Sequence, residues 1–162
     1  MANKLERLLL SLAMVGLTAA ASAWLVQNGI KGWYQPLPKP TYTPPSEWFR
    51  VIWGILYVLM AVSYYLILGL KGNPVFPKAS RLFVCQLFLQ AVWSFVFFRM
   101  GYPGPALAVI LLLDYIVYKM IAAFLKISPA AARLQYPFML WLLYASCLNF
   151  SFVYMNGFIV GF

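Results

Sequence analysis

Five long apolar runs dominate this sequence and limit what it can fold into. They cover residues 8–26, 51–70, 82–98, 106–125 and 137–160. Each run is close to the ~20 residues that an α-helix needs to cross the hydrocarbon core of a bilayer. The chain is 64% hydrophobic and only 9% charged, whereas soluble domains carry about 25% charged residues. The sequence therefore predicts an all-α membrane protein, a bundle of five transmembrane helices.

The five spans use most of the 162 residues, so we expect a single transmembrane domain, 1–162. With their polar flanks, the expected helices are 5–27, 46–70, 79–100, 105–126 and 134–158. The first run has an alternative interpretation, because basic residues precede it and Ala21-Ser22-Ala23 resembles a signal peptidase site. We favour a retained helix, because the run is longer than the apolar region of a signal peptide.

The net charge of +9 comes from 12 basic and 3 acidic residues. The basic residues are spread over every loop and form no patch, so no nucleic-acid partner is expected. With five spans, the larger group falls on the side of the amino terminus: Lys4, Arg7, Lys71, Lys78, Arg81, Lys119, Lys126 and Arg133. In a bacterial inner membrane, the positive-inside rule then places the amino terminus in the cytoplasm.

The sequence lacks the side chains that many catalytic and metal sites require. It has no histidine, and its only carboxylates are Glu6, Glu47 and Asp114. This excludes a zinc site of the usual His/Cys type, a His-ligated haem, a Ser-His-Asp triad and a paired-carboxylate hydrolase. No metal or cofactor is therefore expected. Asp114 falls inside a span, where we expect it to accept hydrogen bonds from a neighbouring helix.

A proline-rich stretch, WYQPLPKPTYTPP at 33–45, connects the first two spans. Its prolines lack backbone donors and fix φ, so we expect an extended, stiff connector and no helix. Trp33, Tyr34 and Tyr42 are amphipathic rings suited to the membrane–water boundary. The stretch either covers a cavity as a lid between helices 1 and 2 or serves only as a linker.

Polar and aromatic residues recur at helical spacing in three spans. The stripes are Trp53, Tyr57, Met60 and Tyr64 in the second span, Gln86, Gln90, Trp93 and Phe97 in the third, and Pro137, Trp141, Tyr144, Ala145 and Leu148 in the fifth, with Asn149 beside it. Phenol and amide groups are costly in hydrocarbon, so these faces are expected to point inward. Ordinary interhelical packing and hydrogen bonding would explain them as well as a ligand would.

The proline-rich stretch resembles the Trp-Tyr-x-x-Leu-x-Lys-Pro-x-x-x-Pro-Pro signature of the TspO/translocator protein family of tryptophan-rich sensory proteins, also called peripheral-type benzodiazepine receptors. Other matching stretches are Trp53-Gly54-x-Leu56-Tyr57, Gln86-Leu87 through Trp93 to Phe97-Phe98, and Ser128-Pro129 through Arg133, Tyr136-Pro137, Trp141 and Leu148-Asn149. The resemblance implies a five-helix bundle, commonly a homodimer, with a pocket covered by the loop between helices 1 and 2. It also implies a multi-pass protein of a bacterial membrane or, in a eukaryote, of the mitochondrial outer membrane.

The resemblance further implies a ligand and a set of site residues. Family members bind porphyrins such as protoporphyrin IX, and benzodiazepine and isoquinoline-type drugs. In bacterial relatives two pocket tryptophans support light-dependent porphyrin breakdown, and by motif these correspond to Trp53 and Trp141. The expected ligand-binding residues are Tyr34, Pro44, Trp53, Tyr57, Gln86, Gln90, Trp93, Trp141, Ala145 and Asn149. The porphyrin would be a ligand, with no cofactor required.

Three functions remain open on the sequence. The first is a receptor or sensor that binds tetrapyrroles, the second a light-dependent porphyrin-degrading enzyme, and the third a transporter of tetrapyrroles or sterols. Sterol recognition as in the animal proteins is disfavoured, because no basic residue follows Asn156.

Overall fold

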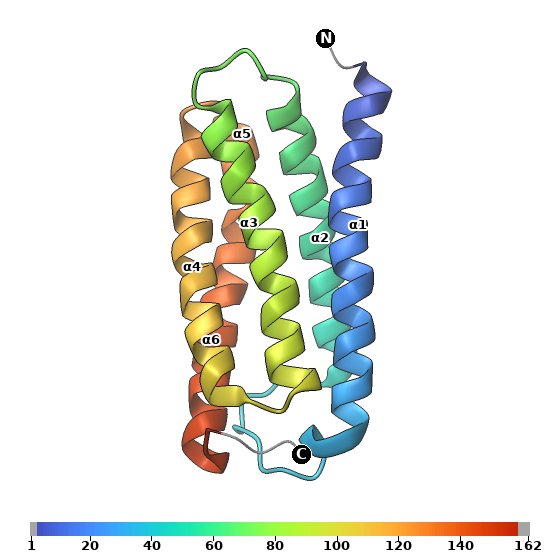
Figure 1. Cartoon of the computed structure of the whole chain (residues 1–162), viewed down its shortest axis with the longest axis vertical. Coiled ribbons are helices and arrows are strands. Elements are labelled where there is room, and N and C mark those ends of the chain that lie inside the picture. The colour runs from blue at the N-terminus through green and yellow to red at the C-terminus, as the bar shows by residue number, and fades with distance from the viewer. Residues whose placement is uncertain (1–2, 159–162) are drawn as a thin grey trace.

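The computed structural model describes residues 3–158, apart from the side chain of Asn28 (Figure 1). Its elements are α1 (Lys4–Gly29), η1 (Ile30–Tyr34), α2 (Ser46–Leu68), α3 (Phe76–Ser94), η2 (Phe95–Arg99), α4 (Pro103–Leu125), α5 (Pro129–Arg133) and α6 (Tyr136–Asn156), where η marks a π-helical turn. The described residues contain no strand. Five helical segments are long and apolar enough to cross a bilayer, so the predicted all-α bundle of five transmembrane helices is confirmed.

Helix α1 starts with a capping box. The Asn3 side chain accepts a hydrogen bond from the first turn, and the Asn3 backbone N–H donates to Glu6 Oε2 at 2.9 Å. At its other end α1 approaches η2 so closely that a Cβ on Gly29 would collide with the carbonyl group of Phe98. Val15 and Leu25 are buried, as expected for a span that belongs to the bundle. The helix therefore packs against the rest of the protein from its middle to its C-terminal end.

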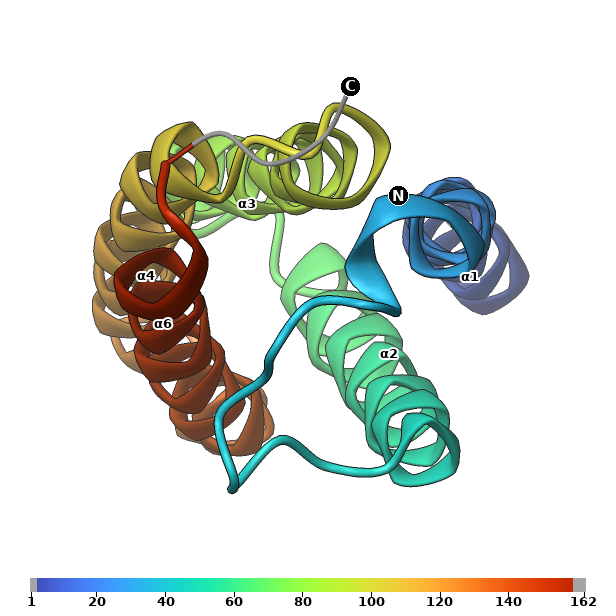
Figure 2. The same ribbon diagram turned by 90° about the horizontal axis from the view of Figure 1, so that it is seen from below.

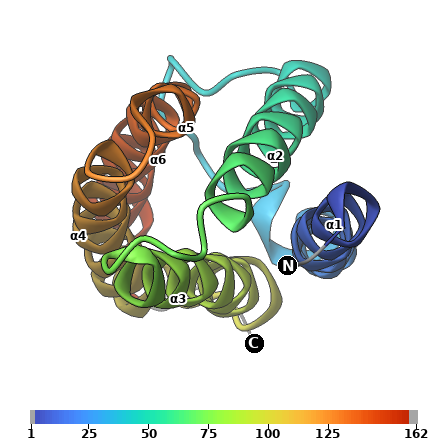
Figure 3. The same cartoon turned by 90° about the horizontal axis from the view of Figure 1, so that it is seen from above.

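Seen along its axis, the bundle is a ring in the order α1, α2, α6, α4, α3 (Figures 2 and 3). Helix α4 packs closely against α3 and α6, and α1 packs against α2 and α3. Helix α2 touches α6 at few points. It is held instead to α5, where Ser63 Oγ donates to the carbonyl oxygen of Ala131 at 2.8 Å. The seam between α2 and α6 is consequently the loosest in the ring.

The start of the proline-rich stretch differs from the expectation of an extended connector. Trp33 and Tyr34 belong to η1, and the loop without regular structure comprises residues 35–45. The prolines begin only at Pro36, and η1 precedes them with a kink at Gly32, whose φ of −95° and ψ of −113° are not helical. The fifth span also differs, because it is divided into α5 and α6. Ser128 caps α5 by accepting from the Ala131 N–H at 3.3 Å.

The two ends of the bundle differ in basic residues as the charge pattern predicts. The start of α1, the connection between α2 and α3, and α5 lie together at one end (Figure 1). That end carries Lys4, Lys71 and Arg133, whereas Lys39 lies in the loop at the opposite end. The helical spans and their arrangement describe a multi-pass integral membrane protein.

Candidate functional site

A small pocket lies inside the bundle at the end covered by residues 35–45. We call it the inner pocket, and it is lined by Tyr34, Pro40, Thr43, Phe49, Trp93, Phe97, Phe98, Ala145, Leu148, Asn149 and Phe152. Its volume is about 40 Å³, close to the ~30 Å³ that one water occupies in the liquid. In this conformation, the side chains that line the pocket leave little empty space between them.

Two π-helical turns bring aromatic rings to the inner pocket. Trp33 and Tyr34 lie in η1, and Phe97 and Phe98 lie in η2. Trp33 Nε1 donates to the carbonyl oxygen of Phe98 at 2.8 Å and so ties the two turns together. Tyr34 stacks on Phe152 of α6 with ring centroids 5.4 Å apart. The aromatic wall is thus built from three distant parts of the chain.

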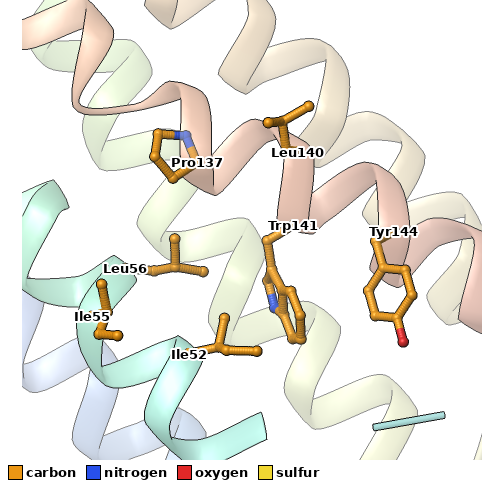
Figure 4. Close-up of a pocket in the computed structure, with 7 residues that line it drawn as sticks. All are labelled: Ile52, Ile55, Leu56, Pro137, Leu140, Trp141 and Tyr144. Atoms are coloured by element: carbon orange, nitrogen blue, oxygen red, sulfur yellow. The ribbon is translucent and has the colours of Figure 1, made fainter. Parts of the chain in front are cut away.

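A larger apolar groove lies between α2 and α6 (Figure 4). This α2–α6 groove is lined by Ile52, Ile55, Leu56, Pro137, Leu140, Trp141 and Tyr144. Its volume of about 420 Å³ falls within the ~300–1,000 Å³ typical of small-molecule sites. Ile55 and Leu140 are 55% and 69% exposed, so the rim of the groove faces the lipid. The Trp141 ring projects from α6 toward α2, with its nitrogen on the side of Ile52 and Leu56 (Figure 4).

Aromatic rings lie between the groove and the inner pocket. Phe49 lines the inner pocket, and its ring centroid is 5.9 Å from that of Trp141, which lines the groove. Trp53 meets Trp141 edge-on at 6.5 Å and lies 5.5 Å from Tyr57. We call Phe49, Trp53 and Trp141 the aromatic partition. A movement of this partition would join the two spaces.

The tryptophans differ in whether their indole N–H is hydrogen-bonded. Trp33 donates to a backbone carbonyl, and Trp93 Nε1 donates to Asn149 Oδ1 at 3.1 Å. The buried Nε1 atoms of Trp53 and Trp141 have no hydrogen-bond partner among the described residues. An unpaired buried donor costs about 1–3 kcal/mol. A ligand acceptor placed beside either indole would remove that cost.

The buried amides of α3 and α6 also differ. Both polar atoms of Asn149 are hydrogen-bonded, because Oδ1 accepts from Trp93 and Nδ2 donates to the carbonyl oxygen of Pro103 at 2.8 Å. Gln90 has neither amide atom paired within the described part of the chain, and Gln86 Oε1 is likewise unpaired. Gln86 Nε2 makes only a 3.8 Å contact to Met60 Sδ. The two glutamines therefore have unpaired polar atoms inside the bundle, whereas each polar atom of Asn149 has a partner.

The loop of residues 35–45 is fastened to α6. Tyr144 donates to the carbonyl oxygen of Tyr42 at 2.5 Å, and the Tyr42 hydroxyl lies 2.6 Å from Ser151 Oγ. Asn156 Nδ2 donates to the carbonyl oxygen of Pro38 at 2.9 Å. These contacts hold the loop across the end of the bundle (Figure 2).

Asp114 lies away from both cavities, at the contact between α4 and α6. Ser146 Oγ donates to Asp114 Oδ2 at 2.7 Å, so the expected hydrogen bond from a neighbouring helix is present. The side chain is 9% exposed, and Oδ1 has no partner among the described residues. This carboxyl group joins two helices and does not line the inner pocket or the α2–α6 groove.

The predicted site residues are divided between the two spaces. Tyr34, Trp93, Ala145 and Asn149 line the inner pocket, and Trp141 lines the groove. Trp53 and Tyr57 pack behind Trp141, whereas Pro44, Gln86 and Gln90 line neither space. In the loop it is Pro40 and Thr43 that reach the inner pocket. The sequence prediction missed both, because loop residues follow no helical period.

The sequence prediction also missed two aromatic residues that lie one turn beyond the ends of the stripes. Phe49 lies one turn before Trp53, and Phe152 lies one turn after Leu148. Extending each stripe by one turn would have found both residues. Phe49 was overlooked because it precedes the apolar run 51–70, and Phe152 because the stripe of the fifth span was ended at Leu148.

These features define a class of protein. It is a multi-pass membrane protein whose helices surround aromatic walls beneath a proline-rich loop, with a few unpaired donors and acceptors. The described residues contain no cluster of His, Cys, Asp or Glu that could hold a metal ion. Such an arrangement can hold a flat apolar molecule by stacking and hydrogen bonding.

The chain belongs to the TspO/MBR family, whose model matches residues 8–155. It is 32% identical to the tryptophan-rich protein TspO of Chlorobaculum tepidum, over 94% of this chain and 99% of that protein. It is 35% identical to the translocator protein of Sus scrofa, over 73% of this chain and 71% of that protein. It is 31% identical to the tryptophan-rich sensory protein of Cereibacter sphaeroides, over 90% of this chain and 88% of that protein.

Proposed function

We propose that this protein is a membrane receptor or sensor that binds porphyrins of the protoporphyrin IX type, and benzodiazepine or isoquinoline-type ligands, within its helix bundle. The observation that carries the proposal is the pair of Trp53 and Trp141, which lie in ring contact with buried, unpaired indole N–H groups. A flat macrocycle provides both the surface that such rings stack on and acceptor atoms for their N–H groups. The protein with bound ligand would then act as a signal in tetrapyrrole regulation or in a stress response.

The mouth of the inner pocket has the charge that a propionate requires. Lys39 Nζ lies 4.8 Å from the ring centroid of Tyr34 and donates to the carbonyl oxygens of Gln35 and Leu37. An ammonium group has three donors, so one remains for a ligand carboxylate. Porphyrin binding would also have to enlarge the inner pocket, because its present volume is about 40 Å³. Displacing the aromatic partition into the α2–α6 groove would provide that space.

Protoporphyrin IX titration in the dark tests the proposal. We expect it to quench tryptophan fluorescence, because Trp53 and Trp141 would lie against the macrocycle. The Trp53→Phe, Trp141→Phe double variant should lose most of the quenching. Trp48→Phe is the matched control, since Trp48 is 64% exposed and lines neither cavity. Equal quenching of wild type and double variant would remove both residues from the ligand site.

A second candidate function is photo-oxidative porphyrin degradation, favoured by the 6.5 Å contact between the same two indoles. Illumination of the porphyrin complex in air should then bleach the porphyrin faster in wild type than in either single Trp→Phe variant. Identical bleaching rates at equal porphyrin occupancy would leave binding as the function and exclude this reaction.

We also propose that the protein acts as a homodimer in a bacterial membrane. Ala13, Gly16 and Ala20 lie exposed on α1, and a Cβ on Gly16 would meet no atom of the same chain. Small residues at this spacing let two helices approach closely. Sedimentation in mild detergent should show a dimer that Gly16→Leu weakens. A monomer at every protein concentration would contradict the proposal.

A further inference from the structure

The looseness of the α2–α6 seam bears on how a ligand reaches the inner pocket. We propose that the ligand enters sideways from the bilayer through the α2–α6 groove, with the Trp141 ring as the gate. This inference rests on the proposed function, because it assigns the entrance to the same binding site.

The end of the bundle is covered by a fastened loop. Three hydrogen bonds join residues 35–45 to α6, from or to Tyr144, Ser151 and Asn156. Five prolines stiffen residues 33–45, so the loop has few other conformations to adopt. Entry from the aqueous side would require these bonds to break, so removing any one of them should make that route faster.

Opening the α2–α6 groove would break fewer hydrogen bonds than opening the loop. Helix α2 is tied to α5 through Ser63, but its other half meets α6 through ring contacts such as Phe49 with Trp141 and Trp53 with Phe138. The indole N–H of Trp141 has no hydrogen-bond partner among the described residues. Rotating this ring therefore breaks no hydrogen bond of its own. The tethered Trp93, by contrast, would have to release Asn149 before it could move.

The chemistry of the groove selects what can pass. Its rim is aliphatic, with Ile55 and Leu140 exposed, so it admits a molecule already dissolved in the hydrocarbon of the bilayer. The nitrogen of Trp141 faces Ile52 and Leu56 across the groove (Figure 4). Because this nitrogen is buried, an entering molecule with a carbonyl or carboxyl oxygen would reach it as a hydrogen-bond donor only once the ring has turned. The fitting ligand is thus a flat, largely apolar aromatic compound that carries oxygen acceptors.

Beyond the Trp141 ring lies Phe49, which lines the inner pocket. Rotation of the Trp141 ring, followed by movement of the Phe49 ring behind it, would thus connect the groove to the inner pocket. Tyr144 lines the groove and also donates to the carbonyl oxygen of Tyr42 in the loop. All three hydrogen bonds of the loop are made to α6, so the loop can stay fastened to α6 while α2 moves away at the seam.

The test is the association rate of protoporphyrin IX with the protein in lipid nanodiscs, followed by porphyrin fluorescence in the dark. Leu140→Trp fills the groove at its rim, and Leu143→Trp is the matched control on the same helix, exposed but outside the groove. We expect Leu140→Trp to slow association and dissociation by about tenfold each, because overpacking raises the barrier to passage. The dissociation constant should stay the same, and Leu143→Trp should match wild type.

Asn156→Leu tests the competing route, because it releases the loop at Pro38. Its association rate should equal that of wild type. Faster association of Asn156→Leu, or equal rates for Leu140→Trp and Leu143→Trp, would overturn entry through the groove. A changed dissociation constant with an unchanged association rate would make the groove part of the bound site and would equally overturn it. Absence of equilibrium binding to wild type would instead remove the proposed function, and the entrance with it.

Discussion

Replacing Asn149 by Leu should destabilise the bundle strongly, because its buried side-chain amide is hydrogen-bonded to residues of two other helices. Asn149 is 2% exposed, accepts from Trp93 Nε1 and donates to the carbonyl oxygen of Pro103. Leucine has a similar size, so the change creates little cavity and leaves two polar groups unpaired. Each would cost about 1–3 kcal/mol, and hydrogen bonds between membrane helices contribute only about 0.6 kcal/mol on average. We expect a loss of about 2–4 kcal/mol in the free energy of unfolding.

Unfolding by SDS in mixed micelles, followed by circular dichroism, gives the required free energy. Asn156→Leu is the control, because Asn156 is only half-buried and donates at the end of α6. Adding Trp93→Phe to Asn149→Leu removes one of the unpaired groups, so the double variant should lose less than the sum of the single changes. A loss below about 0.5 kcal/mol for Asn149→Leu would refute the reasoning, since it would mean that water or a relaxed backbone satisfies both groups.

Two further changes test how the helices are held together. Gly29→Ala should destabilise the protein by about 1–3 kcal/mol, because the new Cβ collides with the backbone of Phe98. Gly54→Ala is the control: its Cβ meets no atom, so it should stabilise α2 by about 0.5–1 kcal/mol. SDS unfolding measures both free energies, and equal effects would contradict the packing of α1 on η2. Ser63→Ala should cost about 1 kcal/mol by leaving the Ala131 carbonyl oxygen without its partner, and an unchanged unfolding curve would show that this bond does not tie α2 to α5.

Sequence by itself determined the spans, and it predicts the side of the membrane that each loop occupies. Both follow from local quantities: the length of an apolar run and the count of basic residues between runs. Helical periodicity also identified residues that turned out buried, such as Met60, Gln90 and Trp93, because a repeat near 3.6 residues marks one face of a helix. The family resemblance then paired Trp53 with Trp141, and the structure places these two residues of the stripes in contact.

Tertiary structure alone decided how those faces meet. Periodicity identifies one face of a helix but not the residues opposite that face. It could not show that the Asn149 side chain is hydrogen-bonded to Trp93 and to the carbonyl oxygen of Pro103. Nor could it separate the tethered Trp93 from the unpaired Trp141, because the difference lies in the relative rotation of α3 and α6. The loose α2–α6 seam likewise depends on interhelical distances, which packing of all the side chains fixes together and no local pattern encodes.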